Sequence, residues 1–215
     1  GDEAGTAITT GDNNVAVGFE ALKTLATSSQ NTAVGHTALK FNTAANNSAF
    51  GYGALAANSS GTANLAVGRS ALAANTTGDN NTAVGKSALT ANTTADNNTA
   101  VGQNALNVNT TGAANVAVGK SALQANTTAS SNVAFGQDAL LTNTTGSYNT
   151  ALGYEALRLA TTAANNTAVG RQALAANTTG ANNTAVGALA GDAITTATDN
   201  TAVGYAALTA TTTGA

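Results

Sequence analysis

The stretch Asn81–Asn97, NTAVGKSALTANTTADN, is followed directly by Asn98–Ala114, NTAVGQNALNVNTTGAA, so the same text is written twice with few changes. Such copies fill the chain, and most of them start 17 residues apart. One copy, which starts at Asn31, has 16 residues and lacks one in its FNTAAN segment. We therefore expect a single repeat array over residues 1–215, whose repeats begin at Asn14, Asn31, Asn47, Asn64, Asn81, Asn98, Asn115, Asn132, Asn149, Asn166, Asn183 and Asn200.

Residue types are sorted by their place in the repeat, which we number from position 1 at the first Asn to position 17. Position 3 is always Ala and position 5 always Gly, while position 4 is Val, Phe or Leu and position 9 is Leu except at Gly191. All seventeen charged residues lie at positions 6, 7, 10, 16 or 17. A disordered low-complexity chain has no reason to sort charges in this way. The pattern therefore indicates a folded chain with fixed buried positions.

The repeat length favours an all-β fold. Seventeen residues are too few for the paired-helix repeats of about 33 residues, and Thr, Val and Gly disfavour helix. Short apolar segments bounded by Gly and Asn are typical of strands separated by turns. We predict a parallel β-solenoid, or β-roll, with one coil per repeat and about twelve coils. Positions 2–5 are expected to form one strand, 5–7 a corner, 8–13 a second strand and 14–17 a wider turn.

Strand alternation predicts which side chains point inward. On the expected second strand, position 10 carries charged residues and therefore points outward. Positions 8, 10 and 12 are then expected outside, and positions 9, 11 and 13 inside. Columns of Val, such as Val84, and of Leu, such as Leu89, are expected to form a thin core. On the first strand, positions 3 and 5 form a face of Ala and Gly that permits close approach of another backbone. We interpret this charge-free strand as covered by another copy of the chain; the alternative is a flat exposed face of small residues.

Asn at position 1 is expected to form a structural ladder from coil to coil, through its side-chain amide and the turn backbone. The members of this ladder are the twelve Asn residues that open the repeats. Position 12, with Asn75, Asn92, Asn109 and Asn126, is a candidate for a second ladder.

The text NTAVG..AL resembles the head repeats of YadA-like trimeric autotransporter adhesins, and also the repeat arrays of phage-type tail-fibre proteins. The matching residues are the apolar position 4 and the Gly at position 5, and the resemblance covers the whole chain. It implies a left-handed β-roll in which three chains pack together as a homotrimer. The present repeat is longer than the adhesin repeat, and its extra residues lie in the NTTG segment.

Composition excludes several functions. The charged fraction is 8%, against about 25% in an average soluble domain, and Pro, Cys, Met and Trp are absent. A net charge of −3 provides no basic patch for nucleic acid. No apolar run reaches the roughly 20 residues that cross a bilayer, and no signal peptide is visible. We expect the array to be a piece of a longer fibre protein.

Residues that could carry chemistry are few. His36 is the only histidine and lies at position 6, where a solvated side chain is expected. One His and no Cys provide neither a zinc site nor a histidine-based triad, so we expect no enzyme, no cofactor and no metal. Asp79 and Asp96 share position 16 on adjacent coils, where a hard cation could bridge them; solvated turn carboxylates are the simpler alternative.

Two further patterns concern the surface. Twelve Asn-x-Ser/Thr sequons make N-glycosylation a hypothesis, although the repeat generates them automatically: Asn46, Asn58, Asn75, Asn80, Asn92, Asn97, Asn109, Asn126, Asn143, Asn165, Asn177 and Asn182. Threonine columns at positions 2, 13 and 14 suggest ice binding as an alternative function. The variable position 6, with Phe19, Tyr52, Tyr154 and Tyr205, is the outward stripe where we expect partner contacts.

The sequence thus predicts a non-enzymatic, extracellular structural fibre or adhesin shaft, at a cell or virion surface, that presents a repetitive surface. The expected partners are further copies of the chain, as a trimer or end to end, and glycans or proteins of host or environmental surfaces. An ice-binding or other surface-recognition solenoid that uses Thr and Asn arrays is the alternative.

Overall fold

The structure is a computed structural model that describes residues 1–210, and these residues form short strands joined by turns, without an α-helix. The chain divides into two compact units, Gly1–Thr111 and Gly112–Ala215. The strands of the N-terminal unit are β1 (Val15–Val17), β2 (Thr32–Val34), β3 (Ser48–Phe50), β4 (Leu65–Val67), β5 (Thr82–Val84) and β6 (Thr99–Val101). Those of the C-terminal unit are β7 (Val116–Val118), β8 (Val133–Phe135), β9 (Thr150–Leu152), β10 (Thr167–Val169), β11 (Thr184–Val186) and β12 (Thr201–Val203).

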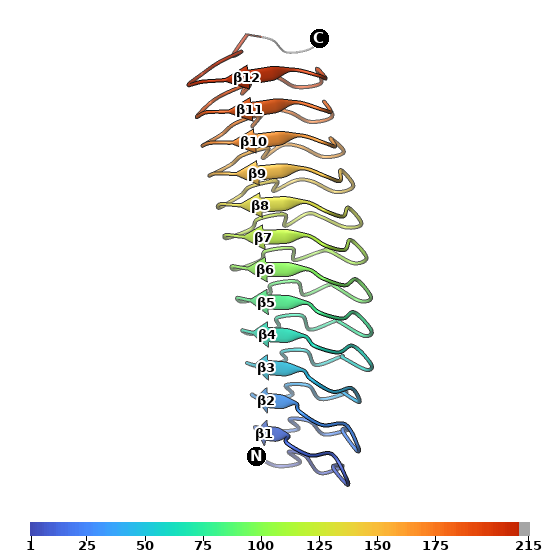
Figure 1. The fold of residues 1–215 in the computed structure, drawn as a ribbon. Coiled ribbons are helices and arrows are strands. Elements are labelled where there is room, and N and C mark those ends of the chain that lie inside the picture. Colours follow the sequence, from blue (N-terminus) through green and yellow to red (C-terminus); the bar gives the residue numbers. More distant parts are fainter. Residues whose placement is uncertain (211–215) are drawn as a thin grey trace. The chain divides into compact units, whose positions relative to one another are not determined.

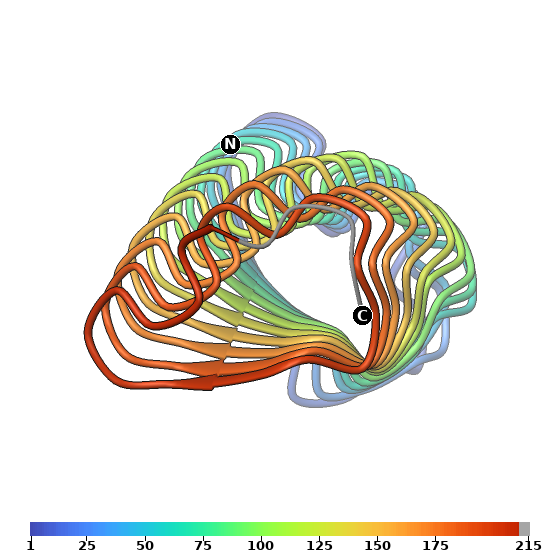
Figure 2. The same cartoon turned by 90° about the horizontal axis from the view of Figure 1, so that it is seen from above.

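Within each unit, every strand pairs in parallel with the strand of the next repeat, and equal positions lie opposite each other. Thr82 faces Thr99, Ala83 faces Ala100 and Val84 faces Val101. Figure 1 shows the strands following in chain order, and Figure 2 shows one circuit of chain between successive strands. In Figure 2 the chain runs clockwise as it rises toward the viewer, so the coil is left-handed. The predicted all-β parallel solenoid with one coil per repeat is confirmed.

The glycine at position 5 is required by contact between coils. Gly85 has a backbone φ of +135°, a value that residues with a side chain rarely adopt. A Cβ atom on Gly85 would lie 2.6 Å from the carbonyl oxygen of Gly102. The close backbone approach that glycine permits therefore occurs between successive coils of the same chain.

The predicted second strand is wrong, because positions 5 to 11 form turns. Within this segment Ser87 has φ 56° and Leu89 φ 52°, both in the left-handed region, which interrupts an extended chain. Ala88 and Leu89 are consecutive, yet both are fully buried. Alternation therefore fails here: positions 8, 9 and 12 point inward, whereas 10, 11 and 13 are half-buried or exposed.

The core consists of Ala and Leu, and the predicted Val column is wrong. Ala83, Ala88 and Leu89 are 0% exposed, whereas Val84 is half-buried and Val203 is 69% exposed. Because the middle Ala of each three-residue strand points inward, its two neighbours point outward. The Ala–Gly face thus lies against the chain's own interior, so our interpretation of that face as the contact with another chain is also wrong.

Asn side chains at position 1 form a ladder through the coil. The side-chain Nδ2 of Asn81 donates to Asn64 Oδ1 at 3.2 Å and to the carbonyl oxygen of Ala95 at 2.9 Å. Its backbone N–H donates to the same Asn64 Oδ1 at 2.9 Å. In the C-terminal unit, Asn166 makes the equivalent bonds to Asn149. Each buried amide is satisfied by the neighbouring coils, which is how a polar column is tolerated in the interior.

Position 12 carries a second ladder, which is buried although alternation placed it outside. Asn92 Nδ2 donates to Asn75 Oδ1 at 2.9 Å and to the carbonyl oxygen of Ala95 at 3.0 Å. Asn92 Oδ1 accepts from Asn109 Nδ2 at 3.2 Å. These bonds tie each turn to itself and to the adjacent coil.

Irregular repeats keep this interior filled. Gly191 replaces Leu at position 9 and Ile194 replaces Asn at position 12; a Cβ on Gly191 would lie 3.1 Å from Ile194 Cδ1. Gly5 and Ile8 form the same pair, also at 3.1 Å. The isoleucine therefore occupies the volume that the leucine leaves.

The short repeat that starts at Asn31 accommodates its deletion in a turn. Asn42 Nδ2 donates to the carbonyl oxygen of Ala44, two residues ahead, whereas Asn92 reaches Ala95, three residues ahead. The missing residue therefore lies in the turn after position 12, which was expected.

Candidate interaction surfaces

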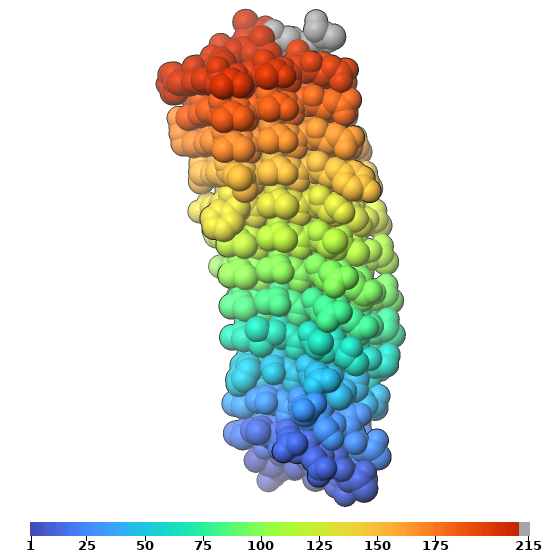
Figure 3. Space-filling view, in the orientation of Figure 1, coloured from blue at the N-terminus to red at the C-terminus, as the bar shows by residue number. Residues whose placement is uncertain are grey.

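The outward side chains at positions 2 and 4 of the strands form a surface that we name the sheet face. Val17 is 54% exposed, Phe135 57% and Val186 39%. None of the residues in β1–β12 is charged. Figure 3, in the orientation of Figure 1, shows the side chains of each unit in rows, one row per coil. The sheet face is therefore uncharged, partly apolar and repeated at the spacing of the strands.

The position 6 stripe contains a short stack of aromatic rings. His36 lies between Phe19 and Tyr52, with ring centroids 5.0 Å apart on both sides. The histidine is exposed, as expected for a solvated side chain, but it is also held by these neighbours. Phe19 and Tyr52 are 43% and 58% exposed. One face of each of these two rings therefore packs on the imidazole.

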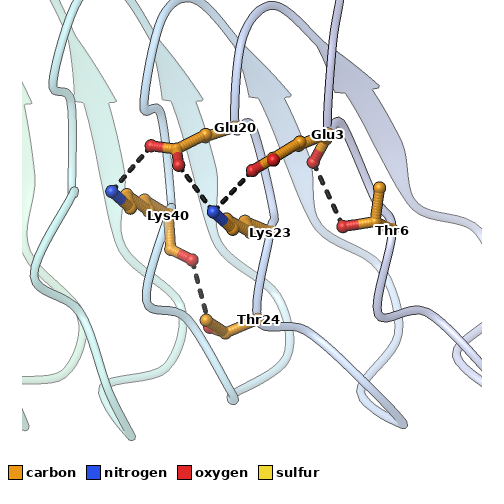
Figure 4. A network of polar contacts seen from close by, with 6 residues as sticks. All are labelled: Glu3, Thr6, Glu20, Lys23, Thr24 and Lys40. Carbon is orange, nitrogen blue, oxygen red and sulfur yellow. Dashed lines mark hydrogen bonds and ion pairs between the residues drawn. The ribbon is translucent and has the colours of Figure 1, made fainter.

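A network of charged side chains joins the first coils of the N-terminal unit (Figure 4). Lys23 Nζ pairs with Glu3 Oε2 at 2.5 Å and with Glu20 Oε1 at 2.6 Å. Lys40 Nζ pairs with Glu20 Oε2 at 2.6 Å. The hydrogen bonds from Lys23 and Lys40 lower the pKa of the Glu20 carboxyl to about 2. Sequence reasoning did not find this network, although charges at positions 7 and 10 of adjacent repeats were its signal.

Asp79 and Asp96, the two turn carboxylates on adjacent coils, each accept a hydrogen bond from the preceding coil. Asp79 Oδ1 accepts from the backbone N–H and the hydroxyl of Thr62, at 2.6 and 3.0 Å. Asp96 Oδ1 accepts from the Asp79 backbone N–H at 2.7 Å. Within residues 1–210, no group of three or more His, Cys, Asp or Glu side chains could hold a metal ion. The two carboxylates instead bind the turn of the preceding coil.

The twelve sequons fall into two sets. Seven belong to the position 12 ladder and are 0% exposed: Asn58, Asn75, Asn92, Asn109, Asn126, Asn143 and Asn177. Five lie at position 17 and are exposed: Asn46, Asn80, Asn97, Asn165 and Asn182. On the folded chain only this second set is accessible to a modifying enzyme.

A surface hollow of about 210 Å³ lies on the C-terminal unit and was not found from the sequence. Three successive repeats line it, with Arg158, Ala175 and Asp192 at position 10. The small Ala175 leaves a gap between two larger charged neighbours. A small residue between opposite charges in one column was the signal that could have revealed it.

In the described part of the chain, no helix has the length and apolarity needed to cross a lipid bilayer. Comparison of the chain with protein-family models, with curated proteins and with solved structures found no match in any of the three.

Proposed function

We propose that the chain is a non-enzymatic structural segment of an extracellular fibre or adhesin, and that it associates with further copies of itself through the sheet face. The observation that supports this most directly is the absence of charge at positions 2 and 4 in all of β1–β12, together with exposed side chains such as Val17 and Phe135. A solvent-exposed strand face normally carries polar and charged residues. The extracellular location and a trimeric state rest on the resemblance of the repeats to adhesin heads.

The period of the sheet face favours a second copy as the partner. Side chains recur every coil, at about 4.8 Å along the sheet. Another copy has the same period, so contacts made by one coil are repeated by the next without loss of register. An unrelated protein surface lacks this period and matches at only a few coils. Because the sheet face is uncharged, its partner needs no complementary charges.

The size of the face indicates that many coils must take part. A strand of three residues is about 10 Å long and adds about 5 Å of height, hence roughly 50 Å² per coil. The six strands of one unit provide about 300 Å², against about 800 Å² per partner in a typical stable interface. We therefore expect side chains that flank the strands to take part in the association as well.

The mass of the full chain in solution, measured by light scattering after size exclusion, tests this proposal. We expect an oligomer, with three copies as the first candidate, that dissociates when a charge is placed on the sheet face by Val186→Lys. The matched control is Thr179→Lys, an exposed turn position in the preceding repeat, which is expected to leave the mass unchanged. A monomeric wild type at high concentration, or equal masses for both variants, would contradict it.

Ice binding is a second candidate, favoured by four successive outward threonines at position 2: Thr150, Thr167, Thr184 and Thr201. The threonines at position 13 are less suited, because hydroxyls such as that of Thr76 donate to the next coil, here to the carbonyl oxygen of Thr93 at 2.9 Å. Thermal hysteresis of the purified chain tests this candidate. Activity that is lost in Thr167→Lys would favour it; hysteresis no greater than that of an inert protein would exclude it.

A further inference from the structure

Charged side chains of opposite sign border the sheet face at the two ends of its strands. Figure 2 shows the strands along one side of the circuit, between two corners. Positions 16 and 17, which precede each strand, form what we name the start edge, and position 6, which follows it, forms the end edge. Every charged residue of the start edge is acidic, and every charged residue of the end edge except Asp2 is basic. The start edge has Asp12, Asp79, Asp96 and Asp199, and the end edge has Arg69, Lys86, Lys120 and Arg171.

In the N-terminal unit, charges of both signs flank the neighbouring strands β4, β5 and β6. Asp79 lies three residues before β5 and Lys86 two residues after it. Arg69 follows β4 in the same way, and Asp96 precedes β6. Arg69 and Lys86 are exposed, and among the described residues neither pairs with a carboxylate. A strand of about 10 Å separates the two edges, so these opposite charges are too far apart to pair within one copy.

The carboxylates of the start edge keep an oxygen for a further partner. Asp79 and Asp96 each use only Oδ1 for their hydrogen bonds to the preceding coil. A carboxylate can accept about four hydrogen bonds through its two oxygens. Both residues can therefore bind a cation from outside the chain and retain the bonds that hold their turns.

We propose that the two edges make copies of the chain associate in parallel, with the end edge of one copy against the start edge of the next. This proposal rests on the proposed function, because it requires that copies meet at the sheet face. When the stacks of coils run parallel, each strand ends where the partner's strand starts, so Lys86 pairs with the partner's Asp79. When the stacks run antiparallel, like edges meet, so Asp79 approaches the partner's Asp79 and is repelled.

The neighbouring coils extend this contact. In a closed symmetric oligomer of parallel copies, equal coils lie at equal heights. Arg69 is then one coil, about 4.8 Å, from the height of the partner's Asp79, and Asp96 is equally far from that of the partner's Lys86. The charges alternate along the contact, whether the oligomer has two copies or three. The match is poorer at the first coils, where Asp2 approaches the partner's Asp12.

The dissociation constant of the oligomer, measured by analytical ultracentrifugation of the full chain, tests this pairing. Lys86→Glu should raise it at least about 10-fold at low salt, because a carboxylate then faces the partner's Asp79. Asp79→Asn should raise it about 3-fold in the wild type, as expected for the loss of an exposed ion pair. In the Lys86→Glu background Asp79→Asn should instead lower it, because it removes the repulsion. Asparagine keeps an Oδ1 acceptor for Thr62, so the turn is retained.

Two matched controls change charges that have no counterpart in this arrangement. Arg171→Glu reverses a charge at position 6 of β10, a strand whose start edge has the uncharged Ala164 and Asn165. Asp138→Asn removes a position 7 carboxylate that binds Gln137 of its own chain. Each should change the dissociation constant less than about 2-fold. High salt should reduce the effects of Lys86→Glu and Asp79→Asn, because it screens exposed charges.

The sign of the Asp79→Asn effect distinguishes the two orientations. A wild-type oligomer that Asp79→Asn strengthens would indicate antiparallel copies, and would overturn this proposal without affecting association through the sheet face. An oligomer with the same dissociation constant in Lys86→Glu would have the same consequence. A wild type that stays monomeric at high concentration would overturn both this proposal and the proposed function.

Discussion

Replacing Ala160 by Asn should stabilise the protein, because it would complete the position 12 ladder. Asn143 Nδ2 donates to Asn126 Oδ1 at 3.1 Å, but Asn143 Oδ1 is buried without a hydrogen-bond partner. The reason is the next repeat, which has Ala160 where the ladder requires an amide donor. An asparagine there would donate to Asn143 Oδ1 and to the carbonyl oxygen of Ala163, as Asn92 does to Asn75 and Ala95.

The expected gain in the free energy of unfolding follows from the polar groups that become hydrogen-bonded. A buried unsatisfied acceptor costs about 1–3 kcal/mol, and each additional hydrogen bond contributes a net of about 1 kcal/mol. Fixing the new side chain costs up to about 1 kcal/mol. The surroundings match those of Asn92, since Leu157 and Ala163 correspond to Leu89 and Ala95 and all four are buried. We therefore expect a gain of about 1–2 kcal/mol, or a rise in Tm of roughly 2–8 °C for a chain of this length.

Urea unfolding followed by circular dichroism measures this gain, with Ala125→Asn as the matched control. Ala125 is half-buried at position 11, which lies outside the ladder and holds larger residues such as Phe41 and Leu159 in other repeats, so its change should stay within about 0.5 kcal/mol. In an Asn143→Ala background, Ala160→Asn should lose most of its effect, because the acceptor is gone. If Ala160→Asn has no effect or destabilises, or if its effect is the same without Asn143, the account of the ladder is refuted.

Three other perturbations test the coil, the charged network and the exchange of core residues. Gly85→Ala should destabilise by about 2–6 kcal/mol in urea unfolding, because the strained φ and the clash with the next coil each cost about 1–3 kcal/mol; a loss below 1 kcal/mol would disprove the contact. Glu20→Gln should lower the free energy of unfolding at pH 7 but not at pH 2. The pKa of the Glu20 carboxyl in the folded protein is about 2, below the ordinary value of 4.5. The stabilisation by Glu20 is therefore present above pH 4.5 and is lost as the pH falls toward 2. Urea midpoints of both proteins across this range check it, and a difference that persists at pH 2 would show that the ion pair with Lys23 is not the cause. Gly191→Leu should destabilise by about 1–3 kcal/mol through overpacking against Ile194, and the added change Ile194→Asn should recover much of that loss; additive effects of the two changes would contradict the exchange.

Much of the fold could be predicted because the repeat imposes translational order. A period of 17 residues with Ala at position 3 and Gly at position 5 leaves few structures other than stacked coils, and parallel register follows because equal residues must lie opposite each other. The sorting of charges likewise indicated an outside at positions 6, 7 and 10. The ladder of Asn at position 1 was expected on the same grounds.

The candidate surfaces could not be predicted to the same extent, because their residues come together through side-chain size and direction in adjacent coils. The hollow beside Asp192 depends on Ala175 being small between Arg158 and Asp192. The network of Glu20 depends on Lys40 reaching back one coil. Neither the reach of the Lys40 side chain nor the unpaired oxygen of Asp192 can be deduced from the order of residues in the sequence.

By itself, the sequence determined the 17-residue coil, its parallel stacking, the place of the glycine corner and the burial of Leu at position 9. Only the tertiary structure decided that Ala at position 8 and Asn at position 12 are buried as well, and that Val at position 4 is not. The physical reason lies at Ser87 and Leu89, whose left-handed φ values turn the chain between them, so that Ala88 and Leu89 both point inward. A single Asn92 is too polar to be buried, and it becomes a core residue only because Asn75, Ala95 and Asn109 satisfy its amide in the folded stack.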